Sequence, residues 1–326
     1  MENLGHSLLV EKYRPDKLEN FVGNENIKKS ISKYLEQNDI QNLIFYGPAG
    51  TGKTTLAKLI IKNLDCDHIY INASDERGIE TIRDKVSGFA SEASFKPLKV
   101  VILDEADFLT IQAQASLRNI IETFSRTTRF IMTCNFVERI IDPLQSRCQV
   151  LKIIPPSKKD VAKHLVKILN EEKISYTPQD IKVIVNQYYP DLRKCINTIQ
   201  LNTRREEDEM HPTNYMVTLK LDKSVLVSST YIKEIISELN KPKPNFKEIR
   251  QIIANANVDD FEELFRALYE NASSYLPNKE GTVAILVNDH QYKSNFRIDK
   301  EINTMSLIQN IINNYATNTT TTRTSY

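Results

Sequence analysis

The chain has 326 residues, of which 40% are hydrophobic and 26% are charged, and its formal net charge is +1. This length exceeds one typical core, so we expect two or three domains in a globular protein. No apolar run is long enough to cross a bilayer, and the opening residues lack the layout of a secretory signal. We therefore expect a soluble globular protein, and the widely scattered cysteines favour a reducing cytoplasm. With almost no net charge, any contact with nucleic acid must come from a local basic patch.

Cysteine and histidine are scattered along the chain. The five histidines are dispersed, and no two cysteines are separated by two residues. The sequence therefore predicts neither a zinc site nor a disulfide framework, in keeping with a reducing compartment. The four cysteines are Cys66, Cys134, Cys148 and Cys195.

The first half of the chain alternates short apolar runs with helical patterns. Between the runs, segments such as TTLAKLIIKNL carry apolar residues at helical spacing. Strand and helix repeated in this order predict an α/β domain over residues 1–154, with a mainly parallel sheet. The expected buried strands are 42–47, 68–74, 99–107, 129–135 and 149–154.

The rest of the chain is expected to be all-α. Two prolines break the pattern, Ser157 is a candidate helix cap, and residues 155–215 are predicted to form a small helical domain. The charged segment 205–215 is the predicted linker to a second helical domain, 216–315. The Thr-rich tail, 316–326, has no periodicity and is predicted to be disordered.

The segment GPAGTGKT, residues 47–54, fits the phosphate-binding loop pattern G-x-x-x-x-G-K-[ST]. It follows a predicted strand and opens a predicted helix, which makes a chance glycine-rich turn the weaker interpretation. Backbone N–H groups would converge on phosphate oxygens, Lys53 would neutralise the β- and γ-phosphates, and Thr54 would bind Mg²⁺. The residues expected at the phosphates are Gly50, Thr51, Gly52, Lys53, Thr54 and Thr55.

An acidic pair ends the apolar strand VVILDEAD, residues 100–107. Asp104 is placed to hold the metal ion, and Glu105 to polarise the water that attacks the γ-phosphate. The alternative is an acidic loop after a strand, which the upstream phosphate loop disfavours. The same letters occur in DEAD-box helicases, but those need a second α/β lobe, and the remainder here is helical.

Taken in order, the motifs resemble those of AAA+ ATPases, and among them the clamp-loader small subunits of the replication factor C kind. The resemblance implies an AAA+ domain, a helical lid and a helical collar for the three predicted domains. Three further stretches, FASEASF, YPDLRK and NDHQYKSNF, resemble the clamp-loader large subunit of T-even-like phages. The family motifs are VEKYRP, GPAGTGKTT, NASDERG, LDEAD, TCN, QSRC and DLRKCIN.

The resemblance also implies further nucleotide contacts. Asn135 resembles the sensor that orients the attacking water, and Arg193 the second sensor at the phosphates. Each has a simpler interpretation: Asn135 as a turn residue and Arg193 as a solvated helix charge. The residues that would border the adenine pocket are Val10, Glu11, Lys12, Tyr13 and Val22.

In the stretch QSRC, Arg147 resembles the arginine finger that reaches the γ-phosphate of a neighbouring subunit. A planar guanidinium suits the spread charge of the transferring phosphoryl group. The sequence itself leaves open whether Arg147 acts on its own molecule or on another. Cys148 enters a buried strand and is interpreted as a small apolar filler and not a nucleophile.

Two predicted helices, 75–85 and 109–119, resemble those that hold the DNA backbone in clamp loaders. A solvated helix face is the alternative for each basic residue. Gln114 and Arg118 resemble the pair that couples DNA to the nucleotide site, but Asn119 stands where many relatives have a second arginine. The candidate phosphate contacts are Arg77, Arg83, Lys85 and Thr110.

The resemblance implies a DNA-dependent ATPase that uses ATP and Mg²⁺ to load a sliding clamp onto primer–template DNA. Its partners would be like subunits in a ring or spiral, such as a homotetramer, together with a companion clamp-loader subunit. A branch-migration motor of the AAA+ class and a structural clamp-loader subunit without hydrolysis remain as alternatives. If the source is viral, the compartment would be the host cytoplasm.

Overall fold

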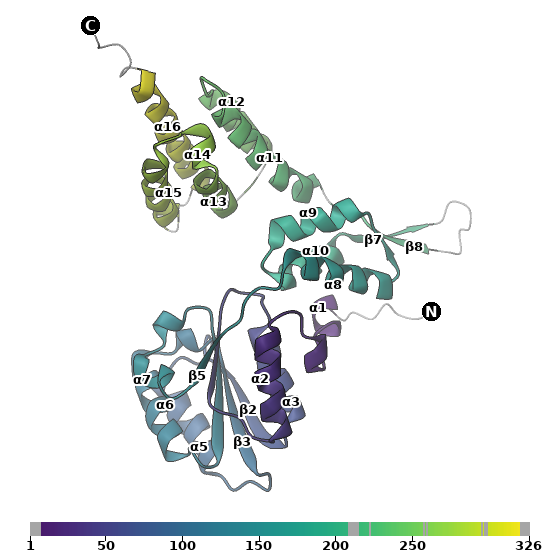
Figure 1. Ribbon diagram of the computed structural model, residues 1–326, viewed down its shortest axis with the longest axis vertical. Helices are drawn as coiled ribbons and strands as arrows, with labels where there is room; N and C mark the ends of the chain where they lie inside the picture. Colours follow the sequence, from purple (N-terminus) through teal and green to yellow (C-terminus); the bar gives the residue numbers. More distant parts are fainter. Residues whose placement is uncertain are drawn as a thin grey trace. The chain divides into compact units, whose positions relative to one another are not determined.

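The computed structural model describes residues 8–207, 215–221, 223–256, 258, 260–294, 296 and 299–319. The chain forms two compact units, Met1–Lys220 and Leu221–Tyr326 (Figure 1). The division falls five residues beyond the predicted start of the last domain at 216, because strand β8 (Tyr215–Leu219) belongs to the first unit.

A five-stranded parallel sheet forms the centre of the ATPase-like part of the first unit. Its strand order is β2-β3-β4-β1-β5. All neighbouring strands are parallel, so every connection between consecutive strands returns across a face of the sheet, as in other doubly wound α/β folds. All five predicted strands are confirmed, with ends shifted by at most three residues. The strands are β1 (Leu43–Tyr46), β2 (Cys66–Asn72), β3 (Leu98–Asp104), β4 (Thr128–Cys134) and β5 (Gln149–Lys152).

Both faces of the three central strands, β3, β4 and β1, are buried, which is why these strands are nearly continuous apolar runs, whereas the edge strands β2 and β5 are partly open. On one face, Phe45 and Ile102 pack with Leu56 of the helix that follows the phosphate loop. On the other face, Ile44 and Leu103 belong to a second cluster. Because neighbouring strand residues alternate between the two clusters, each strand contributes to two cores at once.

Helices flank the sheet and begin at its edges. Thr110 caps α6 by accepting a hydrogen bond from the Ala113 N–H at 3.2 Å. The helix predicted over 75–85 begins later, at Ile79, and continues through a π-helical turn, Ile82–Val86, to end at Ser91. The α-helices of this part are α1 (Leu9–Lys12), α2 (Glu25–Glu36), α3 (Lys53–Asn63), α4 (Ile79–Thr81), α5 (Ser87–Ser91), α6 (Ile111–Thr123) and α7 (Asp142–Gln145).

The lid that follows contains helices α8 (Lys158–Glu171), α9 (Pro178–Tyr188) and α10 (Leu192–Leu201). Ser157 caps α8, as predicted, and accepts from the Asp160 N–H at 3.2 Å. The prediction that this domain is helical only was wrong. The lid also holds a three-stranded sheet, ordered β6-β8-β7, built from β6 (Ile174–Ser175), β7 (Thr203–Glu207) and β8.

The second unit is all-α, as predicted for the collar. One apolar cluster joins its helices, and its largest fully buried side chain is Phe265. The buried His290 and Asn303 satisfy each other, with 2.9 Å between His290 Nδ1 and Asn303 Oδ1. The helices are α11 (Lys223–Leu239), α12 (Phe246–Ala256), α13 (Glu262–Glu270), α14 (Ala272–Tyr275), α15 (Glu280–Ser294) and α16 (Lys300–Thr319).

The final helix changes one prediction about the tail. Residues 316–319 are helical, although the sequence predicted disorder from 316 onward. The rest of that predicted tail, 320–326, lies outside the described residues. Among the helices described, none combines the length and apolarity needed to cross a membrane.

Candidate nucleotide-binding site

The phosphate loop lies at the carboxyl edge of the parallel sheet, directly after β1. There Lys53 is only 8% exposed, and its ammonium donates to the carbonyls of Gly47 and Pro48, each at 2.8 Å. It also donates to Asn135 Oδ1 at 2.8 Å. Burial lowers the pKa of Lys53, so these acceptors, together with nearby Asp104 and Asp107, hold a charge that the fold has partly desolvated. A phosphate arriving here would meet a cation with little competing water.

Glycine is required at position 50 for two reasons. Its φ of +71° lies in the left-handed region, and a Cβ built there would come within 1.9 Å of Asp191 Oδ1. Asp191 caps helix α10 by accepting from the Lys194 N–H at 3.0 Å. The close approach of loop and lid brings Arg193, in the first turn of α10, to the wall of the phosphate pocket.

Asp104 ends β3 and faces the start of α3. Its two carboxylate oxygens accept from the Thr54 hydroxyl at 2.8 and 3.1 Å. The Tyr70 hydroxyl donates to Oδ2 at 2.5 Å, and the Thr133 hydroxyl donates to Oδ1. Burial and the bond to Asp104 raise the pKa of Tyr70, so this phenol stays protonated and is a permanent donor. Three hydroxyl groups therefore fix the orientation of one carboxylate.

Glu105 adopts a left-handed backbone conformation, with φ of +56°. Such a conformation is uncommon for a residue other than glycine and costs about 1 kcal/mol or more. Its N–H donates to the Thr133 hydroxyl at 3.1 Å, which holds the turn. Glu105 and Asp104 both line the phosphate pocket. Two adjacent carboxylates are thus available for different tasks.

Asn135 follows β4, the strand next to β3 in the sheet. The backbone N–H groups of Asn135 and Phe136 both donate to Asp107 Oδ2, each at 3.3 Å. Asp107 is buried, and its other oxygen has no hydrogen-bond partner among the described residues. The LDEAD motif gave no signal of a role for its last acidic residue, Asp107, but these two hydrogen bonds show that it positions the segment that carries Asn135.

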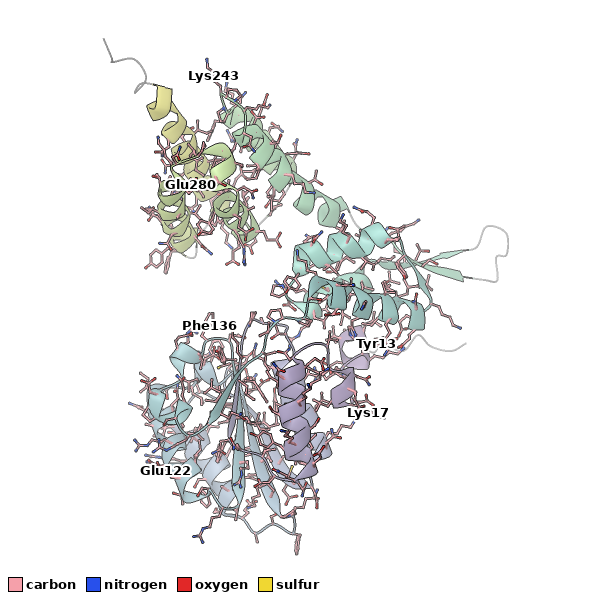
Figure 2. All side chains as sticks on the ribbon, in the orientation of Figure 1. Tyr13, Lys17, Glu122, Phe136, Lys243 and Glu280 are labelled. Atoms are coloured by element: carbon pink, nitrogen blue, oxygen red, sulfur yellow. The ribbon has the colours of Figure 1, made fainter. Side chains whose placement is uncertain are left out.

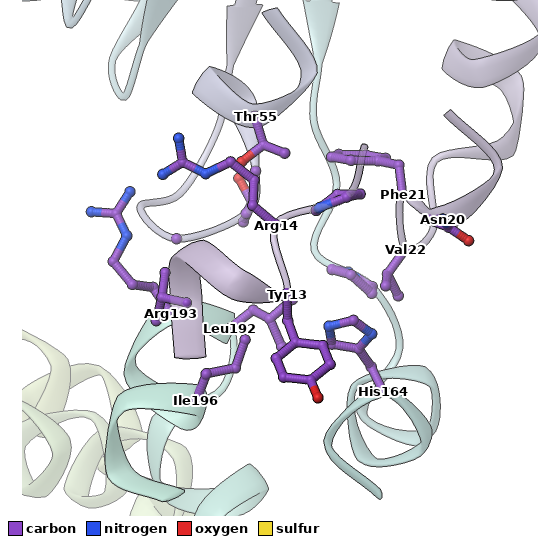
Figure 3. A pocket seen from close by; sticks show the side chains of 16 residues that line it. Tyr13, Arg14, Asn20, Phe21, Val22, Thr55, His164, Leu192, Arg193 and Ile196 are labelled. Carbon is purple, nitrogen blue, oxygen red and sulfur yellow. The ribbon is translucent and has the colours of Figure 1, made fainter. Parts of the chain in front are cut away.

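A second, more apolar pocket adjoins the phosphate loop and is lined from both the ATPase part and the lid. Figure 3 shows the rings of Tyr13 and His164 near each other in the pocket, with Thr55 on the phosphate-loop side. Burial lowers the pKa of His164, so its ring is neutral at physiological pH. An apolar slot with neutral rings suits a flat base, and it opens onto the phosphate site. Lining residues that the sequence analysis missed include Arg14, Asn20, Phe21, Pro156, His164 and Ile196.

The predicted adenine contacts divide into two groups. Val10, Tyr13 and Val22 line this pocket, but Glu11 and Lys12 do not. Glu11 instead accepts from Arg14 at 2.5 Å, and Lys12 pairs with Glu172 of the lid at 2.5 Å. The reason is the short helix α1: its exposed face carries the charged side chains, and the opposite face turns Val10 and Tyr13 inward.

The predicted phosphate residues are brought together. Both pockets are lined by Gly50, Gly52, Thr55 and Arg193, so these residues lie where the two pockets adjoin. Thr51 is different, because its buried side chain donates to the Pro48 carbonyl at 2.8 Å and stabilises the loop itself.

Arg147 lies at the opposite end of the strands from this site. It precedes Gln149, the first residue of β5, whose register partner is Leu43 at the start of β1. The phosphate loop follows the other end of β1. The Arg147 Nε donates to Glu122 at 2.6 Å, and its Nη1 donates to the Pro143 carbonyl at 2.7 Å. In Figure 2, Glu122 lies well away from Phe136, the neighbour of Asn135.

The predicted DNA contacts lie on or beside the short helices and the N-terminus of α6. Arg77 donates to the Ser74 carbonyl at 2.9 Å, and its guanidinium lies 5.6 Å from the centre of the Phe108 ring. Lys85 pairs with Glu76 at 2.7 Å, and Arg83 belongs to the π-helical turn. The Thr110 N–H donates to the Arg77 carbonyl at 3.2 Å, which joins the two segments.

The predicted coupling residues are placed differently from each other. Gln114 is buried and donates to the carbonyls of Leu109 and Arg139, at 3.1 and 3.0 Å, and accepts from the Ile141 N–H at 2.9 Å. It therefore ties α6 to the segment between Asn135 and α7. Arg118 is bonded only locally in the described hydrogen bonds, to Asn119 at 2.9 Å.

The residues present fit a magnesium ion. The Thr54 hydroxyl and Asp104 carboxylate supply hard oxygen donors beside the loop that would carry the phosphates. Within the described parts of the chain, no group of three or more His, Cys, Asp or Glu residues forms a metal cage. Mg²⁺ is usually held by one or two carboxylates together with substrate phosphates, and the Asp104 carboxylate beside the phosphate loop fits that mode of binding.

Comparison with known proteins now identifies the family. The model of the ATPase family associated with various cellular activities (AAA) matches residues 43–156. The replication factor C small subunit of Archaeoglobus fulgidus is 34% identical over 315 residues, which cover 93% of this chain and 94% of that protein. The chain belongs to the replication factor C small-subunit family.

Other family members give shorter alignments. The replication factor C small subunit of Sulfolobus acidocaldarius is 40% identical over 200 residues, 59% of this chain and 62% of that protein. This match thus spans less than two thirds of the relative's length. A probable replication factor C subunit 5 of Dictyostelium discoideum is 35% identical and covers 72% of this chain and 73% of its own.

Solved structures support the fold. RuvB of Thermotoga maritima, described as a Holliday junction branch migration motor, has a TM-score of 0.52 at 16% identity, over 82% of this chain and 80% of that chain. A substituted form of the same protein has a TM-score of 0.53 at 17% identity, over the same shares of the two chains. At such identities the likeness concerns the fold alone, and it agrees with the predicted AAA+ architecture.

Proposed function

We propose that this chain is an ATP-hydrolysing clamp-loader subunit, which loads a sliding clamp onto primer–template DNA during replication. The observation that carries the proposal is that Lys53, Asp104, Glu105 and Asn135 converge at one edge of the sheet. They do so in a chain that belongs to the replication factor C small-subunit family. The alternative of a branch-migration motor is supported only by a fold likeness at low identity. A structural subunit without hydrolysis is disfavoured because each of these four residues is present.

The site has a residue for each step of phosphoryl transfer to water. Lys53 would neutralise the β- and γ-phosphates, and Thr54 and Asp104 would hold Mg²⁺, which supplies further positive charge at the same oxygens. Glu105 polarises the attacking water, and Asn135, fixed by Lys53 and Asp107, orients it. Val10, Tyr13 and Val22 hold the base, so that ATP bridges the ATPase part and the lid.

Arg147 acts on the nucleotide of a neighbouring copy or companion subunit. In its own chain, Arg147 lies beyond the amino end of β5, which is level with the start of β1. The phosphate loop follows the other end of β1, and the four residues of that strand span about 13 Å at about 3.3 Å per residue. A guanidinium at this end is therefore available to a second molecule. ATP binding and assembly into a ring or spiral would then depend on each other.

DNA would be held by phosphate contacts from Arg77, Arg83, Lys85 and Thr110. Their existing partners are backbone carbonyls and exposed side chains, such as the Glu76 that pairs with Lys85. Exposed ion pairs contribute at most about 1 kcal/mol, so exchange for DNA phosphates is feasible. Binding should be sensitive to salt and insensitive to base sequence.

The proposal is tested by measuring ATP hydrolysis and clamp loading with the purified assembly, the sliding clamp and primed DNA. Hydrolysis should rise when clamp and primed DNA are both present, and Lys53→Ala should abolish it together with nucleotide binding. Translocation along branched DNA without clamp loading would support the motor instead. Clamp binding without turnover would support the structural subunit.

A further inference from the structure

Tyr70 is the one aromatic group bonded to the Asp104 carboxylate among the described hydrogen bonds, and none of the family motifs includes it. It lies on β2, an edge strand, where its register partner is Ile102 and the partner of Asn72 is Asp104. Side chains two residues apart on a strand share a face, so Tyr70 reaches Asp104 diagonally across the β2–β3 pair.

The position of the Tyr70 ring is set from outside the site. Tyr70 is 43% exposed, and the Lys58 ammonium of α3 lies 4.9 Å from the centre of its ring. This contact is within the range of a cation–π interaction and fixes the ring against the helix that begins at the phosphate loop. An aromatic residue left this exposed contributes little to the core, but its hydroxyl donates to the carboxylate that also accepts from Thr54 and Thr133.

The three hydroxyl donors to Asp104 are not equivalent once a metal ion binds. Thr54 is itself the expected metal ligand, so its hydroxyl oxygen would turn from Asp104 to the ion. Thr133 then holds Oδ1, and Tyr70 holds Oδ2. Without the Tyr70 donor, Oδ2 would keep no hydrogen bond from the residues described, and the carboxylate could rotate.

We propose that Tyr70 is a positioning residue of the magnesium site, which acts through Asp104 and tunes affinity for the divalent cation. This inference rests on the proposed Mg²⁺–nucleotide site. Partners of metal-bound carboxylates typically contribute about 10–100-fold to metal affinity. We therefore expect loss of the Tyr70 hydroxyl to weaken metal binding by about ten-fold, while binding of the nucleotide itself is unchanged.

The test uses the full chain with Tyr70→Phe, which keeps the ring over Lys58 and removes only the hydroxyl. Mn²⁺ binding in the presence of ADP is measured by electron paramagnetic resonance, and ADP binding is measured separately in EDTA. The control is Tyr275→Phe, which removes a hydroxyl that donates to the Leu268 carbonyl, also at 2.5 Å, in the second unit. The expected result is weaker Mn²⁺ binding for Tyr70→Phe alone, with equal ADP affinity in EDTA.

A change in thermal stability of Tyr70→Phe without nucleotide, with Mn²⁺ affinity within about two-fold of the unaltered chain, would overturn the inference and assign Tyr70 a structural role. An equal loss of Mn²⁺ affinity in Tyr275→Phe would overturn it as well, because that hydroxyl lies in the other unit. If the unaltered chain itself binds no Mn²⁺ with ADP, the proposed nucleotide site fails instead. The failure of the inference and the failure of the proposed function are therefore distinct.

Discussion

Replacement of Arg147 by alanine should leave ATP binding intact and lower clamp- and DNA-stimulated hydrolysis by about 10³-fold or more, the usual range for an arginine finger. This corresponds to about 4 kcal/mol of transition-state stabilisation. In the free chain, Arg147 is paired with Glu122, and the two side chains are 33% and 52% exposed. Such a pair contributes at most about 1 kcal/mol, so it does not prevent transfer of the guanidinium to a phosphate.

The assay mixes two inactive variants. Arg147→Ala subunits keep Glu105, and Glu105→Gln subunits keep the arginine. In a random equal mixture of a head-to-tail ring, about one quarter of the interfaces would combine an intact Glu105 with an intact arginine. The rate of phosphate release by the mixture should thus recover to about a quarter of the rate of the unaltered assembly. The matched control is Arg126→Ala, which removes an exposed positive charge from the turn between α6 and β4.

No recovery at any mixing ratio would refute action across an interface. The same conclusion would follow if a strictly monomeric chain hydrolysed ATP at the full stimulated rate.

Three other predictions concern single residues. Glu105→Gln should bind ATP normally but hydrolyse it at least about a hundred-fold more slowly, of the order expected for loss of a general base; near-normal phosphate release would rule out that role. Burial raises the pKa of Glu172, but hydrogen bonds from Lys12 and Tyr13 outweigh burial, so the pKa of Glu172 is lowered overall. The charged Glu172 therefore stabilises the fold at pH values above its unfolded pKa, near 4.5. This stabilisation is lost as the pH falls through the lower pKa of the folded state. Glu172→Gln should therefore lower the free energy of unfolding by about 1–2 kcal/mol at about pH 7 and by much less near pH 3. Denaturant titrations that gave an equal loss at both pH values would contradict the proposed role of the Glu172 charge. Burial raises the pKa of the Cys148 thiol to about 12. Cys148 should therefore react with thiol reagents at about pH 8 far more slowly than a free cysteine. Rapid labelling of Cys148 in the folded chain would show that it is not an apolar filler.

The central strands of the sheet were predictable because they are buried on both faces. A strand such as Leu98–Asp104, fully buried along its length, can hardly be anything but an apolar run bounded by polar turns. The lid sheet gave no such signal. Its strand Thr203–Glu207 has the sequence TRREE, without alternating apolar residues, and the central strand also pairs Val217 with the distant Ile174. Pairing across such a distance is a tertiary property that no local pattern reports.

The nucleotide site shows the same division. Lys53, Thr54 and Asp104 occur in motifs whose spacing is dictated by the chemistry, so they could be predicted by position. Phe21 and His164 come from segments far apart in the chain and meet only when the lid folds against the ATPase part. Their residue types carry no local signature of a base-binding pocket.

The separation between the phosphate loop and Arg147 gives each molecule two unlike ends. If Arg147 acts on a neighbour's nucleotide, as proposed, a row of such molecules in an open arc would leave its last nucleotide without an arginine, and that ATP would outlast the others. The partner at that terminal position, another copy or a companion subunit, would then decide whether the final nucleotide is hydrolysed. The two ends of one small sheet would thereby set the number of hydrolysing sites in the assembly.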